Sequence, residues 1–207
     1  MRTFFNYLYF NGKTVEALMY GVKRPRAENE TEEAEFLSRA DQKRLLMIRT
    51  SLDPHLAVRD RAIILLCLDA GLRLMEVQHL TWDDVDLDAK KVKLKDREVP
   101  FSGRLADALQ ELKIYSTSLY VAANQDTGKP LSPASITRIV KTAGELAGIA
   151  DLNCNRLRQN HGLELAKKGI AIEEIGKLMG ISARRAEWYY QEARRAGKKK
   201  ERGTNSG

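Results

Sequence analysis

The sequence has very little cysteine and no long apolar run. Only Cys67 and Cys154 occur among the 207 residues, so neither a disulfide framework nor a cysteine-based metal site is expected. Cys67 lies within the apolar run 63–68 and is predicted to be a packed core thiol. No apolar run approaches the ~20 residues that a membrane-spanning helix needs, and no signal peptide is visible. These absences predict a cytoplasmic protein without a membrane partner.

Positive charge exceeds negative charge. The chain contains 35 Lys and Arg against 28 Asp and Glu, a formal net charge of +7, and 43% of its residues are hydrophobic. The apolar fraction is sufficient for a folded core. The surplus of cations favours a polyanionic partner, because each phosphate neutralised by Lys or Arg releases bound counterions. Residues 28–35 are acidic, whereas residues 194–202 are strongly basic and are a plausible auxiliary phosphate contact.

Hydrophobic periodicity, capping residues and glycines predict a mainly α-helical fold with one small antiparallel β-sheet (α+β). Two short alternating runs, 91–95 and 97–101, are expected to form a hairpin with Val92, Leu94, Val99 and Phe101 on its inner face. The run 118–122 is either a third strand or a loop. Helices are predicted over residues 39–50, 56–70, 74–80, 103–114, 132 or 135 to 148, 155–168, 171–179 and 182–195.

Four segments carry a resemblance to a known family. They are Gly71-Leu72-Arg73, the hairpin with Lys95, the helix start with Arg158, and Leu178-Met179-Gly180 followed by Tyr190, nine residues after Ile181. In this order and at these spacings they resemble the signature boxes of tyrosine recombinases and phage integrases of the Xer-like type. The resemblance implies the catalytic-domain fold of that family and a function in DNA recombination or integration, as in mobile elements.

The resemblance also implies a domain organisation. Residues 1–20 resemble the last helix of the family's N-terminal core-binding domain, of which the rest is missing, and residues 21–36 resemble the linker that follows it. Residues 37–195 are expected to form the catalytic domain, and residues 196–207 a basic flexible tail.

Transesterification at a DNA phosphate explains why these residue types belong together. By resemblance, Arg73 and Arg158 clamp the non-bridging oxygens, since guanidinium groups are planar donors that stay charged at any working pH. Lys95 is the candidate acid for the leaving 5′ oxygen, and Lys93, on the same face of the strand, is the alternative. Tyr190 attacks and holds the 3′ phosphate as a phosphotyrosine, so no ATP is needed. Neither a metal nor a cofactor is expected.

Three further assignments complete the predicted site. Glu76 is expected to orient Arg73 as a structural partner. Tyr189, next to Tyr190, is the alternative nucleophile if the register differs by one residue. The side chains expected to contact DNA outside the reacting centre are Arg156, Lys198, Lys199 and Lys200.

Two positions depart from the family pattern. The histidine of the family's His-x-x-Arg box is Asn155 here, and the His or Trp after Leu-Gly is Ile181. Asn155 can donate a hydrogen bond to a phosphate oxygen but cannot carry a proton near neutral pH, and loss of such help commonly costs about 10²–10⁴ in rate. Ile181 can replace only a packing role. His161, on the same predicted helix as Arg158, is interpreted as a packing or surface residue.

Two functions are consistent with this pattern. The first is a site-specific recombinase or integrase that acts on double-stranded DNA, with activity weakened at positions 155 and 181. The second is a degenerate recombinase that binds DNA or regulates an active relative. The resemblance implies a homotetramer on DNA, or pairing with another recombinase. A helical transcription factor would explain the charge but not the ordered segments.

Binding of the isolated protein to duplex DNA should be weakly selective and should fall steeply with salt. Each neutralised phosphate contributes a slope of about −0.9 to the dependence of log K on log salt concentration. Fluorescence anisotropy with one labelled duplex, repeated between about 50 and 200 mM salt, measures this slope. A dissociation constant that does not change with salt would contradict the interpretation of the basic charge.

Overall fold

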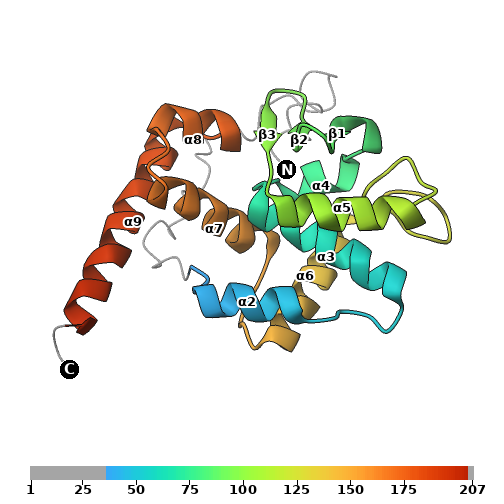
Figure 1. Cartoon of the computed structure of the whole chain (residues 1–207), viewed down its shortest axis with the longest axis horizontal. Helices are drawn as coiled ribbons and strands as arrows, with labels where there is room; N and C mark the ends of the chain where they lie inside the picture. Colours follow the sequence, from blue (N-terminus) through green and yellow to red (C-terminus); the bar gives the residue numbers. More distant parts are fainter. Residues whose placement is uncertain (1–35, 205–207) are drawn as a thin grey trace, which may run out of the picture. The chain divides into compact units, whose positions relative to one another are not determined.

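The computed structural model describes residues 36–204, with side chains described through residue 196. Within this range the chain forms eight α-helices and one three-stranded antiparallel sheet (Figure 1), which confirms the predicted fold class. The elements in chain order are α2 Arg39–Met47, α3 Pro54–Asp69, α4 Leu74–His79, the 3₁₀ turn Trp82–Asp84, β1 Val85–Asp86, β2 Lys91–Lys93, β3 Glu98–Pro100, α5 Gly103–Tyr115, α6 Pro133–Ala147, α7 Cys154–Lys167, α8 Ile172–Met179 and α9 Ala183–Thr204. No helix in the described part of the chain is both long and apolar enough to cross a membrane.

Short polar side chains fix where five of these helices begin. Ser38 caps α2 in a reciprocal pair with Asp41, and Asp53 caps α3 just before its first residue, Pro54. Such side chains satisfy backbone N–H groups that have no partner within the helix. Three more helices begin in the same way, at Ser102, Ser132 and Asn153.

The main hydrophobic core surrounds α3. Its residues from Ala62 to Leu68, including Cys67, are all buried, because α4, α5, α6 and α7 pack around it. The predicted core position of Cys67 is therefore confirmed. A second cluster, with Leu163, Ile175 and Tyr189 at its centre, joins α7, α8 and α9. Figure 1 shows α7 between α3 and the α8–α9 pair, so α7 is shared by both cores.

The sheet has the order β1-β2-β3, with Val92 opposite Val99. Val92, Val99 and Phe101 are buried and Leu94 is partly buried, as the alternating pattern predicts. The backbone N–H of Leu94 donates to Arg97 O at 2.8 Å and closes the turn between β2 and β3.

Several boundaries differ from the sequence predictions. Helix α2 ends at Met47, and α3 begins two residues early because Asp53 and Pro54 start it. Strand β1 was not predicted, since two residues are too few to show alternation. Residues 118–122 are a loop with one isolated bridge, Thr81 to Tyr120. Helix α9 continues to Thr204, so most of the segment predicted as a flexible tail is helical. Residues 1–20 and most of the predicted linker lie outside the described range.

Gly71 and His161 hold α7 against the end of α3. Gly71 has φ +60°, and a Cβ atom there would lie only 2.6 Å from Cδ2 of the His161 ring. Only glycine combines this conformation with this close approach. Burial lowers the pKa of His161 to about 4. His161 is thus the packing residue that the sequence suggested, and it is held neutral.

Asn160 places an amide group in the buried part of the fold. Its side chain is 1% exposed, and among the described residues neither its Nδ2 nor its Oδ1 has a hydrogen-bond partner. A buried, unpaired amide costs about 1–3 kcal/mol. Asn160→Leu, which keeps the shape but removes the polar atoms, should raise the free energy of unfolding by about 1–2 kcal/mol. Urea unfolding measures the change, with Gln159→Leu on the same helix as the control. A loss of stability in Asn160→Leu would mean that the amide has a partner.

The low pKa of His161 predicts a loss of stability in acid. The unfolded chain binds a proton near pH 6.5, whereas the folded chain does so only near pH 4. The contribution of neutral His161 to the free energy of unfolding is therefore fully present above pH 6.5. It is lost as the pH falls toward 4 and amounts to about 1–3 kcal/mol. Urea unfolding of wild type and His161→Gln across this range should show a smaller pH dependence in the variant. His55→Gln is the control, and an equal pH dependence in His161→Gln would contradict the assignment.

Candidate active site

Arg73 and Glu76 open helix α4 together. Arg73 is the N-cap residue, and its backbone N–H donates to Glu76 Oε2 at 2.7 Å while its Nη1 donates to Oε1 at 2.9 Å. Gly71, two residues earlier, turns the chain from α3 into this helix. The carboxylate therefore caps the helix and holds the guanidinium group at the same time.

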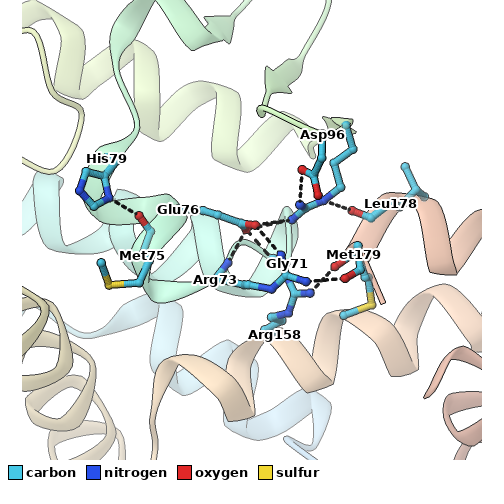
Figure 2. A network of polar contacts seen from close by, with 11 residues as sticks. Gly71, Arg73, Met75, Glu76, His79, Asp96, Arg158, Leu178 and Met179 are labelled. Carbon is cyan, nitrogen blue, oxygen red and sulfur yellow. Dashed lines mark hydrogen bonds and ion pairs between the residues drawn. The ribbon is translucent and has the colours of Figure 1, made fainter. Parts of the chain in front are cut away.

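Glu76 also contacts two arginines from distant segments. Arg97, at the end of the β2–β3 turn, donates from Nη2 to both carboxylate oxygens at 2.9 Å. Arg158, on α7, places Nη1 3.9 Å from Glu76 Oε2. Figure 2 shows the Glu76 carboxylate close to the side chains of Arg73 and Arg158. We call Arg73, Arg97, Arg158 and Glu76 the arginine cluster.

The same three arginines bind the C-terminal end of α8. Arg97 Nε donates to Leu178 O at 2.9 Å. Arg158 donates to Met179 O and also to Gly71 O, and Arg73 donates to Gly180 O (Figure 2). Three successive carbonyl groups thus each accept from a different arginine. Carbonyls at a helix end lack partners within the helix and carry partial negative charge. The arginines therefore supply both the missing hydrogen bonds and a favourable positive charge.

The arginine cluster retains positive charge. Its three arginines face Glu76 and Asp96, which pairs with Arg97 at 2.9 Å, so one charge is left uncompensated. Burial is the main cause that lowers the pKa of Arg158, and the positive charge of Arg73 adds to it, but a guanidinium group stays protonated in proteins. The side chain of Arg73 is 44% exposed, whereas those of Arg97 and Arg158 are 6% and 8% exposed. An anion would therefore meet Arg73 first.

Lys93 and Lys95 lie beside the arginine cluster. Both line a cleft of about 530 Å³ between α4 and the hairpin, together with Glu76, His79 and Asp96. Both lysines are exposed. The structure therefore brings both candidate acids near the arginines and leaves the choice between them open.

Among the described residues, neither candidate tyrosine has a hydrogen bond from its hydroxyl group to Arg73, Arg97 or Arg158. The Tyr190 hydroxyl donates to Ile170 O, in the connection between α7 and α8. Tyr189 is buried against Gly162 and Met179, and this burial raises the pKa of its hydroxyl. Attack by Tyr190 requires that its hydroxyl leave Ile170.

The remaining predicted site residues fall into different environments. Asn155 is exposed in the first turn of α7, and Ile181 is packed in the second hydrophobic cluster. Arg156 donates to Ala150 O in the preceding loop. The side chains of Lys198, Lys199 and Lys200 lie outside the described residues.

The sequence pattern did not predict Arg97 as part of this cluster. The alternating pattern could have identified it. Arg97, Val99 and Phe101 occupy every second position, so their side chains face the same side of the hairpin. A charged residue at an inward position needs a buried partner. That partner, Glu76, lies 21 residues earlier.

Comparison with known proteins extends these findings. The phage integrase family matches residues 35–195. The tyrosine recombinase XerA of Thermococcus kodakarensis is 33% identical over 189 residues, covering 85% of this chain and 63% of that protein. The XerA of Pyrococcus furiosus is 31% identical over 140 residues, covering 61% of this chain and 48% of that protein. This chain thus spans about half to two thirds of these relatives.

Solved structures show the same fold. The crystal structure of XerA recombinase superposes with a TM-score of 0.67 at 20% identity, over 90% of this chain and 75% of that chain. The XerH site-specific recombinase bound to palindromic difH substrate gives a TM-score of 0.65 at 18% identity, over 79% and 51% of the two chains. Residues 35–195 contain the arginine cluster and both tyrosines. On this match, the protein belongs to the phage integrase family.

Proposed function

We propose that this protein is a site-specific recombinase that cuts and rejoins double-stranded DNA through a tyrosine. The observation that carries the proposal is the arginine cluster, in which Arg73 and Arg158, 85 residues apart in the sequence, share one carboxylate and one helix end. Residues 37–195 are its catalytic domain. The related recombinases described above, one of them bound to a DNA substrate, support the choice of DNA as the partner.

The proposed reaction exchanges one phosphodiester bond for another. The Tyr190 oxygen attacks the phosphorus, the bond from phosphorus to the 5′ oxygen breaks, and a 3′-phosphotyrosine forms. Arg73 and Arg158 stabilise the charge on the non-bridging oxygens, a contribution typically worth several kcal/mol (about 3–4 per donor). A lysine of the β2–β3 hairpin, Lys95 or Lys93, protonates the leaving 5′ oxygen. A 5′ hydroxyl then reverses the reaction on a new strand.

Asn155 and Ile181 limit the proton transfer that the proposed site can provide. Asn155 is exposed at the start of α7 and can donate to a phosphate oxygen, but it cannot take the proton of the tyrosine. Ile181 contributes packing only. The tyrosine proton therefore leaves to water, and we expect slow cleavage.

A second function, DNA binding without strand exchange, is favoured by one specific observation. The Tyr190 hydroxyl donates to Ile170 O, a backbone carbonyl outside the arginine cluster. A protein that keeps this arrangement on DNA would hold the duplex, or pair with an active recombinase, without cleaving it. Assembly into a tetramer on two duplexes is part of the first proposal and not of the second.

Formation of a covalent protein–DNA adduct distinguishes the two functions. The protein is incubated with a pool of nicked duplexes that carry randomised target sequences, so that the site need not be known beforehand. Adducts are resolved on a denaturing gel and their DNA is sequenced. Wild type should form adducts, Tyr189→Phe should retain them, and Tyr190→Phe should lose them because it lacks the attacking oxygen.

The other outcomes have definite meanings. Loss of the adduct only in Tyr189→Phe would move the nucleophile by one residue. Tight binding in a mobility-shift assay without any adduct would contradict the recombinase and support the DNA-binding function. Because Tyr189 is buried against Gly162, thermal unfolding of both variants serves as the folding control.

A further inference from the structure

Arg97 lies at the end of the turn that presents the candidate acid. The turn runs from Leu94 to Arg97 and is closed by the hydrogen bond from Leu94 N to Arg97 O at 2.8 Å. Lys95 and Asp96 are its two central residues. The backbone position of Lys95 is therefore fixed by whatever holds Arg97.

The Arg97 guanidinium group joins three segments. Its Nε donates to Leu178 O at the end of α8, its Nη1 to Asp96 in the turn itself, and its Nη2 to Glu76 on α4. All three nitrogens are thus engaged, and the side chain is only 6% exposed. A planar donor bound on every edge restrains direction as well as distance. Such a group holds the segments that it joins in a fixed orientation.

We propose that Arg97 is a positioning residue, which holds the lysine-bearing turn against the arginine cluster so that the leaving 5′ oxygen is protonated. This inference rests on the proposed recombinase function. The strands on either side are only three residues long, so they restrain the turn weakly. The contacts of Arg97 with Glu76 and Leu178 connect the turn directly to the groups that hold Arg73 and Arg158.

The hairpin should remain folded without Arg97. Val92, Val99 and Phe101 anchor its base in the main core, and Glu76 keeps its contacts with Arg73 and Arg158. Loss of Arg97 should therefore release the turn and leave the phosphate clamp in place. The defect would then lie in protonation of the leaving group rather than in binding of the phosphate.

Substitution of the leaving atom separates these two defects. In the normal reaction the 5′ oxygen departs as an alkoxide unless a proton reaches it. When the bridging 5′ oxygen is replaced by sulfur, a thiolate departs instead, and a thiol ionises near pH 8.5, so no acid is needed. A variant that has lost only the acid is restored by the sulfur substrate, whereas a variant that has lost the phosphate clamp is not.

The experiment measures single-turnover adduct formation on a matched pair of nicked duplexes, one with oxygen and one with sulfur at the bridging position. The variants are Arg97→Met, which keeps the aliphatic length, together with Arg97→Lys, Lys93→Ala and Lys95→Ala. Arg73→Ala is the clamp control. On oxygen, Arg97→Met should be slower than wild type by about 10–10²-fold and the lysine variant that removes the acid by about 10²–10⁴-fold.

On sulfur, Arg97→Met and the acid variant should both come within about threefold of wild type, while Arg73→Ala stays about 10²–10³-fold slow. Arg97→Lys should resemble Arg97→Met, since one ammonium group cannot replace a planar guanidinium group that donates to three segments at once. Recovery on sulfur also shows that the variant is folded. If the acid proves to be Lys93, recovery of Arg97→Met still supports the positioning role, because both lysines belong to the same hairpin.

The failures are distinguishable. If a lysine variant recovers on sulfur but Arg97→Met does not, Arg97 supports the clamp or the fold, and the inference is wrong while the proposed function stands. If Arg97→Met is as fast as wild type on oxygen, the inference is also wrong. If wild type forms no adduct with either substrate, the proposed function is wrong, and the inference fails with it.

Discussion

The carboxylate of Glu76 is the interaction on which the rest of the site depends. It accepts from Arg73 and Arg97 and lies 3.9 Å from Arg158. Guanidinium groups held this close repel one another, and two of them are almost fully buried, which adds a desolvation cost. One carboxylate reduces both penalties, and the carbonyls at the end of α8 supply the remaining acceptors. Removal of the Glu76 charge would therefore do more than break one hydrogen bond, because it would leave buried arginines without their shared counter-ion.

The arginine cluster constrains how the tyrosine can move. Helix α8 is held at its C-terminal end by three arginines, and Tyr190 binds Ile170 O just before its N-terminal end. Gly180, with φ +58°, carries the last of the restrained carbonyls, and residues 181 and 182 lead from it to α9. A change that brings Tyr190 to the arginines must break its bond to Ile170 O. If the three arginine–carbonyl bonds are kept, the change takes place within α9 or in residues 181 and 182, with α8 unmoved.

The sequence was sufficient for the mainly helical fold, because capping residues such as Ser38 and Asp53 and the apolar run of α3 are local signals. It also identified Arg73, Glu76 and Arg158, since family spacing marks them, while their catalytic roles stay predictions. Arg97 was missed because its partner is distant in sequence. The orientation of Tyr190 could not be foreseen either, since the acceptor for its hydroxyl, Ile170 O, is a backbone atom that has no sequence signature.

Asn155 and Ile181 matter for a different reason than the arginines. A guanidinium clamp stays charged at any pH near neutrality, whereas proton transfer needs a group whose pKa lies near the working pH. This chain has the two arginines of the proposed clamp and no histidine at either family position. His161 cannot replace them, because its pKa is about 4 and its ring is packed against Gly71. In the proposed reaction, proton transfer therefore depends on the lysines of the hairpin and on water, so the placement of the β2–β3 turn would determine how fast the leaving group is protonated.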